Sequence, residues 1–168
     1  MTSDHGCRPA EERDLPAITE IYNQAVLGTT GTFDTEPKTV EERAEWLGRQ
    51  GEREPVIVSF SDERVTGWAW LHLWSPKRAY EGTGEVTLYV REDDRGNGVG
   101  TALLRALCES ARSLGYRTLL ARIAEKNDAS LRLHEAAGFE RVGTMKEVGF
   151  KFDRLLDVHL LQKRIERP

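Results

Sequence analysis

The sequence predicts a single α/β (α+β) domain over residues 1–168, with a mixed central sheet of about six to seven strands and helices on both faces. Three observations lead to this fold class. Apolar residues recur at helical spacing near the start of the chain, alternate along the middle of it, and then follow a strand–helix–strand order. The length suits one domain, because domains usually run to about 100–200 residues. No linker rich in Pro, Gly or Ser divides the chain.

Two helices are expected first. Residues 14–28 place apolar side chains at spacings of three and four, with Pro16 in the first turn, where its missing N–H costs nothing. Thr39 is suited to cap a second helix over residues 39–51. Residues 29–37 are expected to form the loop between the two helices.

Strands follow. Residues 55–60 and 65–74 are expected to pair as a hairpin, and residues 84–91 form another strand. One face of that strand is apolar, and the other carries Glu85, Thr87 and Tyr89. The rest of the chain is expected to form a helix, a strand, a helix and two closing strands, over residues 98–115, 118–124, 127–137, 139–148 and 151–162.

The charge balance argues against a nucleic-acid partner. Lys and Arg total 24 and Asp and Glu total 28, which leaves a net charge of −4. A nucleic-acid-binding domain of this size normally carries an excess of Lys and Arg, because phosphate contacts supply most of its affinity.

Several other classes of protein are also not expected. No apolar run approaches the ~20 residues that span a bilayer, and the polar residues 1–13 do not resemble a secretory signal. The two cysteines, Cys7 and Cys108, form no CxxC motif and have no nearby His pair. We therefore expect reduced thiols, a cytoplasmic location, no membrane partner and no metal site.

The most informative segment is a glycine-rich loop between a strand and a helix. It consists of Arg95, Gly96, Asn97, Gly98, Val99, Gly100 and Thr101. Glycines let the backbone approach a ligand closely, and the helix N-terminus offers unpaired N–H groups that favour a phosphate. The loop does not fit the dinucleotide pattern GxGxxG, which would require Gly at position 101. The alternative interpretation is a turn that only joins a strand to a helix.

The placement of this loop supports a resemblance to a known family. The loop follows Leu88-Tyr89-Val90 and resembles the acetyl-CoA loop of the GNAT superfamily of N-acetyltransferases. That superfamily's second cofactor segment is similar to Asn127-x-x-Ser130-x-x-Leu133-His134-Glu135-x-x-Gly138-Phe139. Five segments resemble the pattern of the phosphinothricin N-acetyltransferase group: Tyr22-Asn23, Thr32-Phe33-x-Thr35-Glu36-Pro37, Arg43-x-x-Trp46, Ala79-Tyr80-x-x-Thr83-x-Glu85 and Lys151-Phe152-x-Arg154-x-x-Asp157-Val158. The similarity covers nearly the whole chain.

The resemblance implies a GNAT-like fold with acetyl-CoA as cosubstrate. The residues implied to bind it are Leu88, Tyr89, Val90, Arg95, Gly96, Asn97, Gly98, Val99, Gly100, Thr101, Asn127 and Ser130. Asn127 is also suited to cap the helix that begins there, and the two roles are compatible.

The resemblance also implies two catalytic residues. An amine must lose a proton before it attacks the thioester, and the resembling group assigns this base to the position of Glu85. His134 matches the residue that protonates the leaving thiolate, and the pKa of histidine suits either direction of proton transfer. The alternatives are a surface Glu at a strand end and a helix His that is satisfied by solvent. The other three histidines are expected to be structural, and Cys108 is not expected to be a nucleophile.

The acceptor site implied by the resemblance contains an aromatic residue and basic residues. Its candidate members are Phe33, Lys77, Arg78, Tyr80 and Thr87. A cation there would bind the acidic groups of the acceptor, and a guanidinium suits an oxyanion better than an ammonium does. A solvated Lys-Arg turn is the alternative. Asp153 and Leu155 replace residues that are Gly and Trp in many relatives, which leaves the acceptor open.

We therefore expect a homodimeric N-acetyltransferase that acts on a small amine like that of phosphinothricin, methionine sulfone or methionine sulfoximine, with resistance or metabolism as its role. One alternative is an acetyltransferase for peptide N-termini, polyamines or aminoglycosides. Another is a non-catalytic acyl-CoA sensor, against which the presence of both Glu85 and His134 argues.

Overall fold

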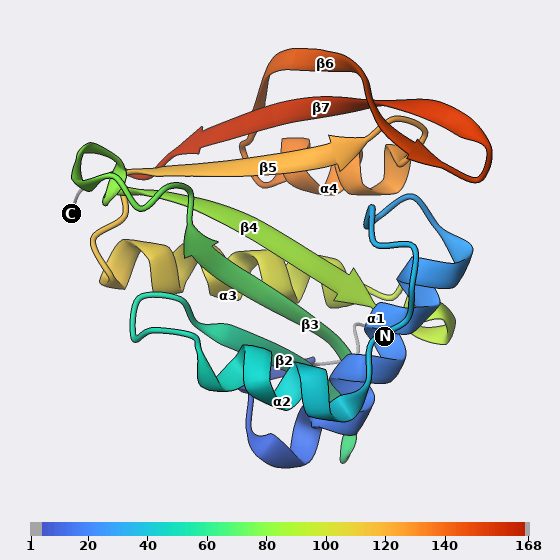
Figure 1. Ribbon diagram of the computed structural model, residues 1–168. Coiled ribbons are helices and arrows are strands. Elements are labelled where there is room, and N and C mark those ends of the chain that lie inside the picture. Colours follow the sequence, from blue (N-terminus) through green and yellow to red (C-terminus); the bar gives the residue numbers. More distant parts are fainter. Residues whose placement is uncertain (1–4, 167–168) are drawn as a thin grey trace.

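The computed structural model describes residues 5–166 and contains one seven-stranded mixed sheet (Figure 1). The strand order is β1-β2-β3-β4-β5-β7-β6. The strands are β1 Gly6–Pro9, β2 Val56–Ser61, β3 Arg64–Leu73, β4 Thr83–Val90, β5 Thr118–Ala124, β6 Glu140–Lys151 and β7 Arg154–Arg164. Among the strands of the described residues, only the β4–β5 pair is parallel. The predicted mixed α/β sheet is confirmed.

Within residues 5–166, four α-helices cover the two faces of the sheet, as the sequence predicts. They are α1 Leu15–Gly28, α2 Val40–Gly48, α3 Val99–Ser113 and α4 Asp128–Ala136. Pro16 lies in the first turn of α1, and Thr39 caps α2 by accepting a hydrogen bond from the backbone N–H of Glu42. Among residues 5–166, none of the helices has the length and apolar character needed to cross a membrane.

Each face of the sheet has its own apolar core. On one face, Ile18 and Val26 of α1 pack with Trp68 of β3, which is only 1% exposed. On the other face, Leu103 and Leu107 of α3 are fully buried against the sheet. Because successive side chains of a strand point to opposite faces, the sheet packs against two separate layers of helices.

Two features of the sheet differ from the prediction. Strand β1 was not expected, because its four residues have no alternating pattern, but it pairs with the edge of β2. Lys151 was expected to begin the last strand and instead ends β6, because the turn lies at Phe152 and Asp153. Both turn residues adopt positive φ angles, 53° and 55°, as a two-residue hairpin turn requires. Neither is glycine, so the sequence carried no clear turn signal there.

The two parallel strands at the centre of the sheet separate after a short paired segment. Strand β4 pairs with β5 only from Thr83 to Glu85, opposite residues 118–120. Beyond Glu85 the two strands diverge, while β5 stays paired with β7 along its other edge over its whole length (Figure 1). The remainder of β4 therefore presents one unpaired edge, and the opening lies in the middle of the sheet.

Candidate active site

A cavity of about 460 Å³ occupies the opening between β4 and β5, and we call it the split-strand cavity. Its walls come from both strands, from α4, from the loop after α1 and from β6. It brings together eight of the predicted site residues, namely Phe33, Glu85, Thr87, Leu88, Tyr89, Asn127, Ser130 and His134. Segments that are distant in sequence therefore meet at one place.

Glu85 lies at the fork of the strands and is held by a two-point ion pair. Its side chain is 6% exposed. The Nε of Arg122 donates to Oε1 at 2.6 Å and its Nη2 donates to Oε2 at 2.9 Å. The Nε2 of His72, which pairs with Glu85 across β3 and β4, lies 3.5 Å from Oε2. Glu85 is thus a buried carboxylate at the wall of a cavity.

Sequence reasoning missed Arg122 and treated His72 as structural. The β3–β4 register that sets His72 opposite Glu85 is not visible in the sequence. Arg122 is 37 residues from Glu85 along the chain, so only the packing of β5 beside β4 joins them. The one available signal was a lone Arg within an apolar strand segment. Burial lowers the pKa of His72, and the nearby Glu85 opposes that effect.

His134 is buried in α4 with a defined tautomer. Its Nδ1 lies 2.8 Å from the backbone carbonyl oxygen of Ser130. A carbonyl only accepts, so Nδ1 carries the hydrogen, and in the neutral ring Nε2 then keeps its lone pair. Burial lowers the pKa of His134, while the bond to Ser130 opposes that effect. Burial therefore favours the neutral imidazole.

A second, larger hollow of about 890 Å³ runs along the predicted glycine loop, and we call it the glycine-loop cleft. Six of the predicted site residues line this cleft but do not line the split-strand cavity. They are Val90, Arg95, Gly96, Gly98, Gly100 and Thr101. Gly96 and Gly98 adopt positive φ angles of 80° and 87°, and no atom lies within 4 Å of a Cβ built on either. The loop thus leads into the first turn of α3 with an open backbone surface and unpaired N–H groups.

Two predicted loop residues do not line the cleft. Val99 is 1% exposed and belongs to the core beneath α3. The backbone carbonyl of Asn97 lies 2.8 Å from Nε2 of His5, and Asn97 does not line the cleft. Neither residue therefore lines the glycine-loop cleft.

The cleft also carries cations that sequence reasoning did not single out. Lys126, Arg132 and Arg154 line it together with Arg95. Their positive charges add to the positive end of the helix dipole at the start of α3. The cleft is therefore suited to a polyanion, although the net charge of the chain is −4.

The two hollows meet. They share six lining residues, which are Thr30, Gly31, Leu88, Tyr89, Asn127 and Ser130. Asn127 caps α4, because its Oδ1 accepts from the backbone N–H of Ser130 at 3.3 Å. A group bound in the cleft can therefore reach into the split-strand cavity.

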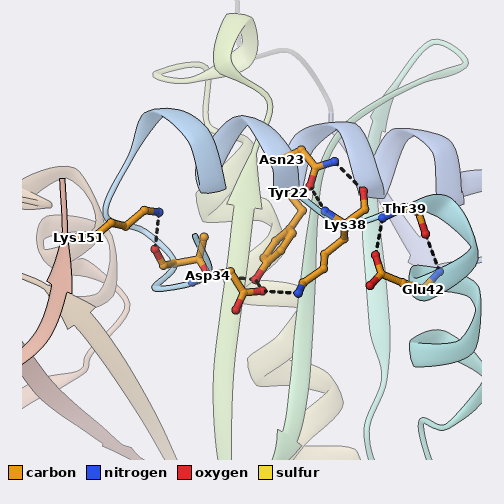
Figure 2. Close-up of polar contacts among 8 residues, drawn as sticks. Tyr22, Asn23, Asp34, Lys38, Thr39, Glu42 and Lys151 are labelled. Atoms are coloured by element: carbon orange, nitrogen blue, oxygen red, sulfur yellow. Dashed lines mark hydrogen bonds and ion pairs between the residues drawn. The ribbon is translucent and has the colours of Figure 1, made fainter. Parts of the chain in front are cut away.

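The loop after α1 is fastened at both ends (Figure 2). Asn23 of α1 exchanges two hydrogen bonds with the backbone of Lys38, each 2.8 Å long. The hydroxyl of Tyr22 donates to Asp34 at 2.6 Å. From the end of β6, Nζ of Lys151 donates to the backbone carbonyls of Thr29 and Thr32, each at 2.8 Å.

Lys151 therefore ties the hairpin of β6 and β7 to the wall of the cavity. Phe33 fits against Gly149 of β6 so closely that a Cβ there would lie 2.1 Å from the ring. Lys151 is buried, and desolvation lowers its pKa, which the charge of Asp34 opposes. The loop that carries Phe33 is thus a fixed wall of the cavity.

The structure does not bring the predicted basic pair to this site. Lys77, Arg78 and Tyr80 are exposed, at a short helical turn before β4. None of the three lines the split-strand cavity or the glycine-loop cleft.

The neutral, buried state of His134 predicts a pH effect on stability. Unfolded histidine titrates near ~6.5, whereas folded His134 has a lower pKa, so the unfolded chain takes up a proton first as the pH falls. The free energy of unfolding should therefore decrease more from about pH 7.5 to about pH 5.5 in the wild type than in His134→Gln. Urea denaturation at both pH values measures this difference. Both proteins keep His72, so parallel pH dependences would contradict a neutral His134.

Comparisons with known proteins agree with this geometry. The family described as Acetyltransferase (GNAT) domain matches residues 7–160. An L-methionine sulfoximine/L-methionine sulfone acetyltransferase from Pseudomonas paraeruginosa is 39% identical over 161 residues, which cover 95% of this chain and 94% of that protein. A phosphinothricin N-acetyltransferase from Streptomyces coelicolor is 38% identical, with 94% of each chain covered.

A solved structure extends the comparison to the fold. A GNAT superfamily phosphinothricin acetyltransferase from Sinorhizobium meliloti, in complex with AcCoA, superposes with a TM-score of 0.93 at 34% identity. The match covers 98% of this chain and 89% of that one. The matching family, the identity and the shared fold show that this chain belongs to the GNAT acetyltransferases, enzymes that use acetyl-CoA as the acetyl donor.

Proposed function

We propose that this enzyme acetylates the α-amine of a small amino-acid-like substrate of the phosphinothricin, methionine sulfone or methionine sulfoximine type. The observation that carries the proposal is the buried carboxylate of Glu85 in a cavity that opens onto the glycine-loop cleft. The relatives named for such substrates cover nearly the whole chain. A volume of about 460 Å³ suits a small acceptor.

In the proposed reaction, Glu85 and His134 handle the two protons that leave the nitrogen. An α-amine with a pKa near ~8 is mostly an ammonium ion at neutral pH, and Glu85 takes its first proton, directly or through a water. The free amine attacks the acetyl carbon, the new C–N bond forms and the C–S bond breaks. His134 accepts the second proton from the nitrogen at Nε2 and delivers it to the departing thiolate.

This assignment refines the role expected for His134. A neutral imidazole with a free Nε2 is an acceptor, so it can protonate the thiolate only after it has received a proton. The acylated nitrogen is the source of that proton. Glu85 and His134 line the same cavity, which supports this division of labour.

For the donor, we propose that the glycine loop holds the pyrophosphate and that β4 and α4 hold the pantetheine arm. Arg95, Gly96, Gly98, Gly100 and Thr101 would face the phosphates, whereas Asn97 and Val99 lie outside the cleft lining. The unpaired edge of Leu88, Tyr89 and Val90 would bind the arm, together with Asn127 and Ser130. Phe33 and Thr87 would contact the acceptor.

We also propose a cytoplasmic location and, as the biological role, resistance to inhibitory amino acids of this kind. Both cysteines are free thiols, which suits a reducing compartment. Acetylation removes the positive charge of the amine, so the product no longer presents the charges of the parent amino acid.

A homodimer is the proposed assembly, with the hairpin of β6 and β7 as its contact surface. The hairpin patch consists of the exposed apolar residues Val142, Met145, Val148, Phe150, Phe152 and Leu155. They lie on and beside an edge strand of 12 residues that is exposed over most of its length. Edges of this kind rarely stay uncovered, because they pair with other chains.

Substitution of a patch residue should therefore dissociate the dimer. Phe150→Glu places a charge on a side chain that is 65% exposed. The wild type should sediment at twice the mass of 19.0 kDa, and the variant at the monomer mass. Val40→Glu, at an exposed apolar residue on α2, is the control and should stay dimeric. A monomeric wild type would contradict the assembly.

The proposed base is tested with Glu85→Gln. Turnover of L-methionine sulfone, L-methionine sulfoximine and L-phosphinothricin should fall by about 10²–10⁴-fold, and its rise with pH should flatten. Acetyl-CoA affinity, measured by calorimetry, should stay within about twofold, because Glu85 does not line the cleft. An unchanged pH profile would exclude Glu85 as the base.

The same panel of acceptors separates the alternatives. It should include a peptide N-terminus, a polyamine and an aminoglycoside. If the enzyme turns over one of these acceptors faster than the amino acids, the proposed class of acceptor is wrong. Binding of acetyl-CoA without turnover of any amine would favour the sensor interpretation.

The glycine loop is tested with Gly98→Val. A side chain at φ 87° is strained and would project over the backbone N–H groups, so acetyl-CoA affinity should fall by about tenfold or more. The control is Gly48→Val at the end of α2, where φ is not positive and no atom lies within 4 Å of the added Cβ. An unaltered dissociation constant in Gly98→Val would refute the role of the loop.

A further inference from the structure

The acceptor proposed above carries a carboxylate, and the split-strand cavity offers one cation to bind it. Among the described residues that line this cavity, Arg122 is the only Lys or Arg. It projects from β5 and its side chain is 51% exposed. We infer that Arg122 is the residue that recognises the α-carboxylate of the acceptor. This inference rests on the proposed function and names the residue that sets its specificity.

The hydrogen bonds of Arg122 leave part of its guanidinium free. The group has five N–H donors in a planar fork. Nε and Nη2 each donate one bond to Glu85, and within residues 5–166 Nη1 makes no hydrogen bond. The outer edge of the fork, Nη1 with the second N–H of Nη2, therefore remains for a second carboxylate. Guanidinium and carboxylate match in this two-point arrangement.

This geometry also places the amine. In an α-amino acid, the nitrogen and the carboxylate carbon are bonded to the same carbon atom. A carboxylate that binds Arg122 therefore brings its own amine close to the group that Arg122 already holds, which is Glu85. One guanidinium thus recognises the acceptor and delivers its ammonium to the proposed base.

The charges of the pair complement those of the substrate. Arg122 is positive and Glu85 is negative, whereas a zwitterionic amino acid carries a negative carboxylate and a positive ammonium. The carboxylate of the substrate can therefore face Arg122 while its ammonium faces Glu85. The third ionisable group at this point is His72, whose Nε2 lies 3.5 Å from Glu85. An amine without a neighbouring carboxylate would leave the free edge of Arg122 unmatched. The pair therefore selects α-amino acids over polyamines and aminoglycosides.

The test compares two acceptors that differ only in the carboxylate, L-methionine sulfone and its carboxamide. The wild type should prefer the acid by about 10- to 100-fold in kcat/KM, the range of a hydrogen bond to a charged group. In Arg122→Gln this preference should fall to within about threefold. Loss of the ion pair to Glu85 affects both acceptors equally, so the ratio reports carboxylate recognition alone.

Three further variants make the result decisive. Arg122→Lys keeps the charge and should retain part of the preference, with a thermal unfolding measurement to establish that each variant is folded. Arg112→Gln removes an arginine at the end of α3, outside the cavity, and should keep the wild-type ratio. An unchanged ratio in Arg122→Gln would overturn the inference, as would loss of the preference in Arg78→Gln.

The same data separate this inference from the proposed function. If the wild type acetylates no α-amino acid, the proposed function fails. If it acetylates both acceptors but Arg122→Gln keeps the wild-type ratio, only the role of Arg122 fails.

Discussion

The early separation of β4 and β5 is the constraint on which the rest of this structure depends. Parallel pairing stops at Glu85, so the sheet that holds the domain together also opens at its centre. Both faces still have continuous apolar cores, because α1 and α2 pack on one side and α3 and α4 on the other. The opening therefore exposes a strand edge to ligands without dividing the domain.

Glu85 draws its character from this position. It is the last residue of β4 that pairs with β5, and it faces Arg122 from one neighbouring strand and His72 from the other. Burial without such partners would make a charged carboxylate costly. The ion pair thus stabilises a carboxylate at the fork, beside the cavity proposed to hold the acceptor. On the other wall, Lys151 fastens the loop that carries Phe33, so the cavity has a defined shape.

Most of the secondary structure could be predicted from the sequence, because it depends on local patterns. Pro16, Thr39 and the alternation along β4 identified their elements within a few residues. The short β1 and the turn at Phe152 and Asp153 could not be found this way. Strand β1 exists because the edge of β2 accepts it, and the turn uses positive φ angles without glycine.

The sequence by itself determined the order of elements, the glycine loop and the family to which the chain is similar, because these follow from spacing along the chain. The tertiary structure alone decided which charges meet. It set Arg122 beside Glu85 across 37 residues and left Lys77 and Arg78 outside the cavity. The register and divergence of strands determine such contacts, and they result from packing of the whole sheet rather than from the residues near each charge.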